Sequence, residues 1–246
     1  MVSFGLAGQK NTKPLAFYPG EQLKYKAYYN WGFIWLYAGD VTFSVKFSEE
    51  NKEIYHFSSI GKTRKGYDWL YKVRDKFESE AFADSLAPVS YSRKTFEGGY
   101  FVNNYYQFDY EKRKIYTNTE NSKKPKTRDT LDLQNRTIDV LTAIYYCRNL
   151  QFSTLRINDT IPLRLIIDNQ IYNLHIRYLG IEDISLKNKK SYSCIKFSIL
   201  LVEGTIFKGG EDLYVWVTND EQRIPVLVES KILVGSVKAM IEDIWP

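Results

Sequence analysis

The most constraining feature of this sequence is the regular alternation of apolar and polar residues along much of its length. Residues 41–47, Val-Thr-Phe-Ser-Val-Lys-Phe, are a clear example. Successive side chains of a β-strand point to opposite faces, so a period of two predicts a strand with one buried face. An amphipathic helix would instead place apolar residues at spacings of three and four. We therefore expect a mainly β chain.

The alternation recurs in a series of segments that are separated by short turns such as Gly98-Gly99 and Asn219-Asp220. Expected strands cover residues 41–47, 54–60, 71–77, 89–95, 100–110, 114–119, 161–167, 171–178, 192–203, 213–218 and 224–234. Because most of them are sequential, they predict an antiparallel meander. We expect a single curved antiparallel sheet, or an incomplete barrel, of roughly ten or eleven strands. The lysine-rich stretch 122–128 is expected to be a loop.

One segment, residues 137–149, has a helical period. Its polar residues recur at spacings of three and four from Asp139 to Asn149. Thr137 is placed to act as the N-cap, and Asp139 in the first turn would complement the helix dipole. Nearly all other residues of the segment are apolar, so the helix must be buried on most of its circumference. We expect it inside the concave face of the curved sheet.

The composition fits one domain without a nucleic-acid partner. At 246 residues, of which 44% are hydrophobic, the chain can bury a sizeable core. We expect a tail at residues 1–15 and one β-rich domain over 16–246. The net charge is +5, and the basic runs lie beside turn residues, which is typical of solvated hairpin ends. No apolar stretch approaches the ~20 residues of a membrane-spanning helix, so no transmembrane segment is expected.

The first nine residues, Met-Val-Ser-Phe-Gly-Leu-Ala-Gly-Gln, resemble the end of a signal peptide. They lack a basic beginning, but they are largely apolar and contain the small-x-small triplet Gly5-Leu6-Ala7. Cleavage after this triplet would leave an exported chain that begins near Gly8. The alternative is a loose tail on a cytosolic protein.

Residue types that serve catalysis and metal binding are scarce. The chain has only two histidines, His56 and His175, and no HExxH, CxxC or calcium-loop spacing occurs. Serine-nucleophile and glycine-rich phosphate motifs are absent as well. Cys147 and Cys194 lie among apolar neighbours, which favours two buried free thiols over a disulfide. We therefore expect a protein without catalytic residues, metal or cofactor.

Three charged residues interrupt apolar faces. Asp75 lies in the middle of the face of residues 71–77, whereas Arg93 and Glu203 lie near strand ends. A buried charge must be paired or hydrogen-bonded, so these residues are either structural ion pairs or the polar end of a ligand pocket. Asp75 is the stronger pocket candidate. An enzyme would need Asp75 and Arg93 as an acid/base pair at one opening.

The aromatic residues, 20 Tyr, 14 Phe and 5 Trp, carry the functional hypothesis. Tyr and Trp have polar tips and can line a cavity for an amphiphile or a sugar as readily as they fill a core. A sheet that curves around one helix tends to leave a cleft between the two. The candidate ligand-binding residues are Tyr71, Val73, Asp75, Phe77, Tyr91, Arg93, Leu141, Tyr145 and Trp216.

Several motifs, in order along nearly the whole chain, resemble those of one protein family. They are Pro19-Gly20-Glu21-x-Leu23-x-Tyr25, Val73-Arg74-Asp75-x-Phe77, Thr137-x-Asp139-Val140-Leu141-x-Ala143, Val215-Trp216-Val217-Thr218-x-Asp220, Arg223-Ile224-Pro225-Val226 and Gly235-x-Val237. The family is an uncharacterised group of exported bacterial proteins, the domain-of-unknown-function family numbered 3108. The resemblance implies a location in the periplasm or outer envelope of a Gram-negative bacterium, and it implies no established activity.

The expected architecture is also similar to the half-barrel of periplasmic lipoprotein carriers, although fold analogy alone does not license a function. We expect a non-enzymatic envelope protein that binds a lipid or another apolar or amphiphilic molecule between the sheet and the helix. The alternative is a structural or assembly factor that docks an envelope protein or a glycan through an exposed strand edge or aromatic patch. A filled core without a cleft would favour the alternative.

Overall fold

Strands make up most of the protein. The computed structural model describes residues 15–31, 34–187, 190–201, 210–231 and 236–245. Within these ranges fifteen strands form one sheet, and the single α-helix is α1 (Val140–Arg148), which is shorter than the helix expected over 137–149. The mainly β fold is therefore confirmed, but the expected number of ten or eleven strands is wrong. The apolar N-terminal nine residues and Glu203 lie outside the described residues.

The strands follow one another along the chain as a series of hairpins. Their bounds are β1 (Gln22–Trp31), β2 (Ile34–Phe47), β3 (Ile54–Thr63), β4 (Val73–Phe82), β5 (Pro88–Glu97), β6 (Tyr100–Asp109), β7 (Lys114–Asn121), β8 (Lys124–Asp132), β9 (Thr137–Ile138), β10 (Thr160–Ile167), β11 (Gln170–Ser185), β12 (Ser191–Leu201), β13 (Gly210–Thr218), β14 (Pro225–Lys231) and β15 (Ser236–Trp245). Neighbouring strands are antiparallel, except that β9 runs parallel to β10.

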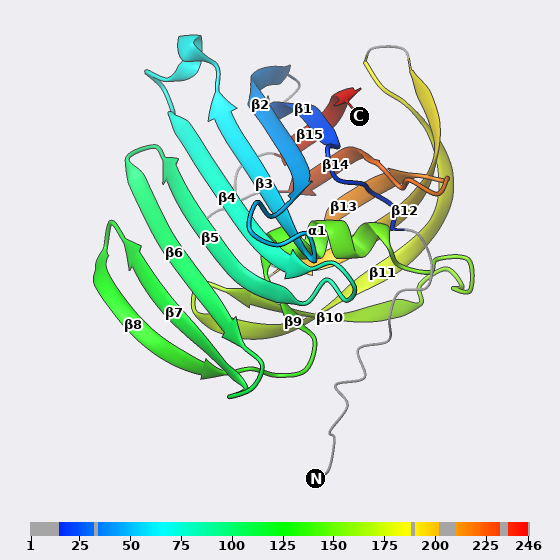
Figure 1. Cartoon of the computed structure of the whole chain (residues 1–246). Helices are drawn as coiled ribbons and strands as arrows, with labels where there is room; N and C mark the ends of the chain where they lie inside the picture. The colour runs from blue at the N-terminus through cyan, green and yellow to red at the C-terminus, as the bar shows by residue number, and fades with distance from the viewer. Residues whose placement is uncertain (1–14, 32–33, 188–189, 202–209, 232–235, 246) are drawn as a thin grey trace.

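The sheet consists of two meanders that are joined by the first and last strands. β1–β8 form one meander and β9–β15 the other, and β1 pairs with β15 in the middle of the sheet. This pairing runs from Gln22 opposite Trp245 to Asn30 opposite Ser236. The end strands β8 and β9 do not pair with each other. The sheet thus curls around the helix without closing (Figure 1).

Four strands lie outside the segments that alternation predicts, namely β1, β8, β9 and β15. β8 begins inside the expected loop 122–128, and all of its residues except Leu131 are exposed, so no apolar face marks it in the sequence. β9 has only two residues. Most of β15 is half-buried on both faces, which removes the contrast between inside and outside on which the period of two depends.

Helix α1 is fastened to the sheet by its N-cap, which is Asp139 rather than the expected Thr137. Asp139 Oδ1 accepts hydrogen bonds from Leu141 N at 2.9 Å and Thr142 N at 2.8 Å. Its Oδ2 accepts from Thr142 Oγ1 at 2.7 Å and from Ser79 Oγ of β4 at 2.8 Å. Thr137 belongs instead to β9. Complete burial raises the pKa of Asp139, although these four bonds favour the ionised form.

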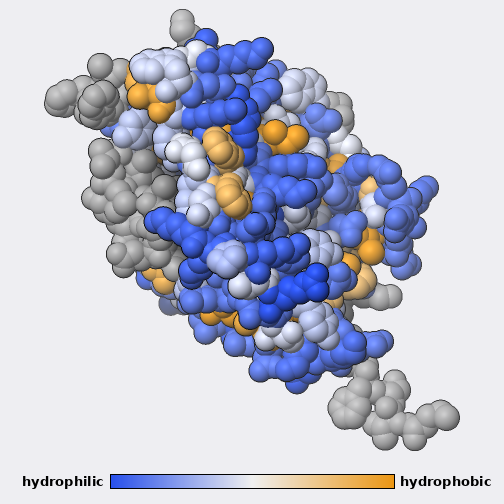
Figure 2. Space-filling view, turned by 90° about the vertical axis from the view of Figure 1, so that its left-hand side faces the viewer, coloured by the Kyte–Doolittle hydropathy of each residue, from blue (hydrophilic) through white to orange (hydrophobic). Residues whose placement is uncertain are grey.

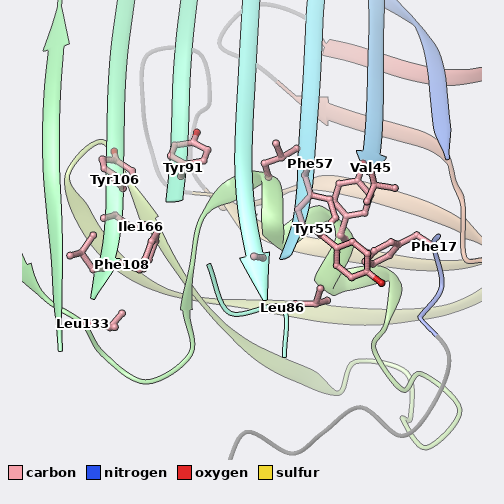
Figure 3. Close-up of a cluster of buried hydrophobic side chains, with 14 residues drawn as sticks. Phe17, Val45, Tyr55, Phe57, Leu86, Tyr91, Tyr106, Phe108, Leu133 and Ile166 are labelled. Carbon is pink, nitrogen blue, oxygen red and sulfur yellow. The ribbon is translucent and has the colours of Figure 1, made fainter. Parts of the chain in front are cut away.

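Side chains fill the interior of the curl in three clusters. In the first, Tyr145 of α1 stacks on Phe57 of β3 with ring centroids 4.0 Å apart, and Phe17 packs edge-on against both rings. Figure 3 shows Phe17 beside Tyr55 and Phe57. The second cluster lies between the helix and β10–β13, and the third joins residues of β1 and β12–β15. The space where a cleft between helix and sheet was expected is therefore filled.

The two cysteines belong to different clusters. Cys147 lies in the second cluster and Cys194 in the third. Both are buried free thiols, as the sequence predicts. Burial raises the pKa of each thiol to about 12, so neither is a reactive thiolate at neutral pH.

A buried ion pair ties the segment before β1 to the end of the helix. Arg148 donates from Nη1 to Glu21 Oε1 at 2.5 Å and from Nη2 to Oε2 at 2.9 Å, and the two side chains are 1% and 2% exposed. Arg148 Nη2 also donates to the carbonyl oxygens of Ala16 at 2.6 Å and of Gln222, between β13 and β14, at 2.9 Å. Three distant segments of the chain meet on one guanidinium group.

Replacing Arg148 with Met should leave the Glu21 carboxylate buried without a counter-charge. We expect a loss of about 3–5 kcal/mol in the free energy of unfolding, measured by urea denaturation followed by circular dichroism. The double variant E21L/R148M removes both charges and should recover much of the loss. Lys114→Met, in the exposed Lys114–Asp132 pair, is the control and should leave the urea midpoint unchanged. An unchanged midpoint in Arg148→Met would contradict the role of the pair.

Candidate functional site

The structure divides the nine predicted ligand-binding residues between the core and an open surface. Tyr91, Leu141 and Tyr145 are almost completely buried in the first cluster. Trp216 is buried in the third cluster, where its indole nitrogen donates to Glu182. These four residues pack the core, and the sequence could not distinguish burial by protein from burial by a ligand.

The other five predicted residues come together at the inner side of the sheet, four of them on β4 and β5 and Tyr71 in the loop before β4. Phe77, Asp75 and Val73 alternate along β4 on the same face as Ser79, which contacts the helix cap. The guanidinium carbon of Arg93, on β5 opposite Phe77, lies 6.0 Å from the Phe77 ring centroid. The face thus continues from the helix N-terminus toward the loop between β3 and β4. We name Tyr71, Val73, Asp75, Phe77, Arg93 and Glu97 the rim cluster.

Tyr71 is placed at the edge of the rim cluster by a glycine turn. Gly98 lies between β5 and β6 with φ +57°, and a Cβ atom there would lie only 2.3 Å from the Tyr71 ring. Only glycine leaves room for this ring while it adopts the left-handed conformation. Burial raises the pKa of the Tyr71 hydroxyl, and the negative charges of Glu97 and Asp75 raise it further.

Asp75 is the one carboxyl on this apolar stretch of β4. Across the sheet it faces Gly61 of β3 and Thr95 of β5, and its Oδ1 accepts a hydrogen bond from Phe96 N at 3.3 Å. Burial, and then the Glu97 carboxylate, raise the pKa of Asp75 to about 7, while the Phe96 amide and Arg93 work in the opposite direction. Gly61 has no side chain that could cover Asp75 Oδ2.

Arg93 has a structural partner that the sequence did not reveal. Its Nη1 donates to Asp168 Oδ1 at 3.1 Å, and Asn104 Nδ2 donates to the same oxygen at 3.1 Å. Asp168 lies in the turn between β10 and β11, where Asn169 accepts from Thr117 Oγ1 at 2.5 Å. The tip of this hairpin is therefore held against the inner side of β5–β7. Arg93 therefore forms the ion pair that the structural interpretation expects, while its place beside Phe77 leaves it next to the candidate surface.

Two shallow hollows, each of about 250 Å³, lie away from the rim cluster. The first is on the outer side of β6–β8 and is lined mainly by Tyr105, Gln107, Tyr116, Asn118 and Arg128. Figure 2 shows the side of the molecule on which these strands lie in Figure 1, and hydrophilic residues cover most of it. The second lies between β1, β15 and the end of β11. Neither hollow includes Asp75 or Arg93.

The described ranges contain no group of three His, Cys, Asp or Glu side chains that could hold a metal ion. In the same part of the chain, no helix is both long and apolar enough to span a membrane.

The Asp75 carboxyl should titrate near pH 7, rather than near 4 as in an unfolded chain. A raised pKa in the fold means that the folded state binds the proton more tightly, so the stability of the protein should fall as pH rises from about 4 to about 7. Asp75→Asn removes this dependence, and the exposed Asp84→Asn is the control. Carboxyl carbon shifts from nuclear magnetic resonance give the pKa directly. Titration of Asp75 near pH 4 would refute the assignment.

Comparisons with known proteins establish the fold and the family. No curated protein sequence matches this chain. Among solved structures, the chain is similar to a β-barrel-like protein of domain of unknown function DUF1849 from Brucella abortus, with 9% identity, a TM-score of 0.57 and coverage of 92% of this chain and 96% of that one. This similarity shows a shared curled-sheet fold.

A protein with a YmcC-like fold from Bacteroides fragilis is more distant, with 11% identity, a TM-score of 0.32 and coverage of 93% and 97%. The family model of DUF3108, proteins of unknown function, matches residues 24–242. The resemblance of the sequence motifs is thereby confirmed, and the chain belongs to the DUF3108 family.

Proposed function

We propose that this protein is a non-enzymatic binding protein that holds an amphiphile against the rim cluster. The observation that carries the proposal is the Asp75 carboxyl, which is half-buried on an apolar face beside Glu97. Among the described residues, no ion pair to Asp75 is present, and Arg93 bonds to Asp168 instead. Two carboxylates in a poorly solvated site repel each other, so ionised Asp75 stands to gain from a bound cation or hydrogen-bond donor.

The neighbours of Asp75 suit the rest of such a ligand. Val73 and Phe77 flank Asp75 along β4, and both are only partly buried. Tyr71 is exposed at the edge. An alkyl chain laid on these three side chains would remove apolar surface of both partners from water. The ligand class that fits is therefore an amphiphile whose head group carries an amine or donates hydrogen bonds.

The absence of a cleft between helix and sheet, among the described residues, favours the docking alternative for that part of the molecule, and an amphiphile is therefore proposed elsewhere. The first cluster occupies the space between helix and sheet, so the ligand-binding surface is the open stretch of the inner face beyond the helix. Support for a non-catalytic role comes from Arg93, whose guanidinium bonds to the hairpin turn rather than to Asp75.

We also propose an exported location, in the periplasm or outer envelope of a Gram-negative bacterium. It rests on the apolar first nine residues and on the resemblance of the motifs to exported proteins. Recovery of the native protein in the cytoplasmic fraction of its host would contradict this location.

The amphiphile proposal predicts a preference for a cationic head group. By calorimetry above pH 7, where Asp75 is ionised, dodecylamine should bind more tightly than dodecanoic acid, and the preference should shrink below pH 7. Asp75→Asn should weaken dodecylamine binding about tenfold or more, the usual loss for a charge-assisted hydrogen bond. The exposed Asp84→Asn should have no effect.

Native mass spectrometry of gently purified protein, with organic extraction, should reveal a co-purified amphiphile. An apo mass that stays unchanged after incubation with envelope lipids and with dodecylamine would refute amphiphile binding and favour the docking alternative.

The hollow on the outer side of β6–β8 favours a second candidate function, glycan docking. Tyr105 and Tyr116 are exposed there beside Gln107, Asn118 and Arg128. Two aromatic rings can stack on sugar rings while amide and guanidinium groups donate to hydroxyls.

This second candidate predicts that envelope oligosaccharides shift the amide resonances of β6–β8 in nuclear magnetic resonance spectra. Y105A/Y116A should abolish these shifts, because it removes both stacking surfaces, whereas Tyr18→Ala, an exposed tyrosine elsewhere, should preserve them. Equal shifts in Y105A/Y116A and the native protein would exclude the hollow as a glycan site.

A further inference from the structure

The two most exposed large hydrophobic side chains of the described residues are adjacent in one loop. Trp69 is 82% exposed and Leu70 is 67% exposed, and Tyr71, which follows them, is 49% exposed. They lie between β3 and β4, and this loop projects at the upper left of the molecule (Figure 1). We name residues 64–72 the β3–β4 tip. Exposed apolar side chains that are contiguous, rather than scattered singly over the surface, are typical of interaction sites.

Hydrogen bonds at the base of the β3–β4 tip hold it in shape. Asp68 Oδ1 accepts from Thr63 Oγ1 at 2.6 Å, and Asp68 Oδ2 accepts from Arg74 Nη2 at 2.5 Å. The amides of Leu70 and Tyr71 both donate to the Tyr67 carbonyl oxygen at 3.0 Å. These bonds fix the backbone that carries Trp69 and Leu70, and both side chains are exposed on it.

The charges of the β3–β4 tip identify the chemistry of that partner. Arg64, Lys65 and Lys72 are all exposed in the same loop as the apolar residues. The acidic residue of the tip, Asp68, is paired with Arg74. The tip thus combines exposed apolar side chains with three exposed basic residues and has a net positive charge. Trp, Tyr and Leu flanked by Lys and Arg is the composition of protein segments that enter the interface of an anionic membrane.

We propose that the β3–β4 tip docks the protein on the surface of a membrane that contains anionic lipids. Trp69 and Leu70 enter the head-group layer, and Arg64, Lys65 and Lys72 lie against lipid phosphates. This inference does not depend on amphiphile binding at Asp75, because it rests on different side chains. The two sites are nevertheless adjacent, since Tyr71 belongs to both the tip and the rim cluster.

Vesicle flotation of the full chain tests the docking site. The native protein should bind vesicles of mixed phosphatidylcholine and phosphatidylglycerol at low salt, and pure phosphatidylcholine much less. W69S/L70S should lower the partition coefficient on the order of 30-fold, because two large apolar side chains no longer leave water. K65E/K72E should lower it about tenfold or more, and high salt should reduce this difference.

Three controls make the result decisive. Ile181→Ser, which changes a 57% exposed side chain on β11, should bind vesicles as the native protein does. Asp75→Asn should not weaken vesicle binding, because it removes a negative charge and none of the tip side chains, so failure of the amphiphile proposal and failure of this one are distinguishable. Thermal melting should be unchanged in W69S/L70S, because both side chains are exposed.

Either of two outcomes would overturn the proposal. W69S/L70S could bind anionic vesicles as tightly as the native protein, or the native protein could fail to bind them at low salt. If the second result were accompanied by capture of an envelope protein that requires Trp69 and Leu70, the β3–β4 tip would be a protein-docking site instead.

Discussion

One non-local strand pairing turns two meanders into one sheet. β1 and β15 lie at opposite ends of the sequence, yet Gln22 pairs with Trp245 and Asn30 with Ser236. Closing so long a loop costs conformational entropy, which burial of Leu23, Tyr25 and Ile241 beneath the pair offsets. Because the meanders are joined at their first and last strands, both can bend toward the same helix. The contacts between β5–β7 and the β10–β11 hairpin depend on that shared curl.

Polar groups then fix the two halves relative to each other. Asp139 binds Ser79 of the first meander, and Arg148 binds Glu21 before β1 and the Gln222 carbonyl in the second. Such charges are costly to bury unless paired, and here they have partners at hydrogen-bond distance. Asp75 differs, because Glu97 near it carries a like charge and its carboxyl accepts one long hydrogen bond, from the Phe96 amide. This contrast, rather than burial alone, is the reason for proposing a binding site at Asp75 and not at Asp139 or Arg148.

The alternation of residues 71–77 was sufficient to place Asp75 on an inner apolar face. It could not separate Tyr145 or Trp216 from the ligand-binding candidates, because a period of two shows that a side chain is buried and not what buries it. The Arg93–Asp168 contact links two hairpins and has no local signal. β8 was missed for the opposite reason, since both of its faces are exposed. No sequence pattern marks the β3–β4 tip, because Trp69 and Leu70 run directly into the alternating segment 71–77, and the strand itself begins only at Val73.

The β3–β4 tip and the rim cluster are adjacent and share Tyr71, but the tip is rich in basic residues whereas the rim cluster contains two carboxyl groups. The tip carries exposed cations beside its exposed apolar residues, whereas Asp75 lies a few residues further along on the inner face and Glu97 lies near it on β5. An anionic surface attracts the first group and repels the second, so docking would orient the molecule with the rim cluster turned from the phosphates. Proximity to the membrane would also lower the local pH and favour protonated Asp75. A neutral Asp75 binds a cationic head group less tightly, so docking at the tip and retention of a cationic amphiphile would oppose each other.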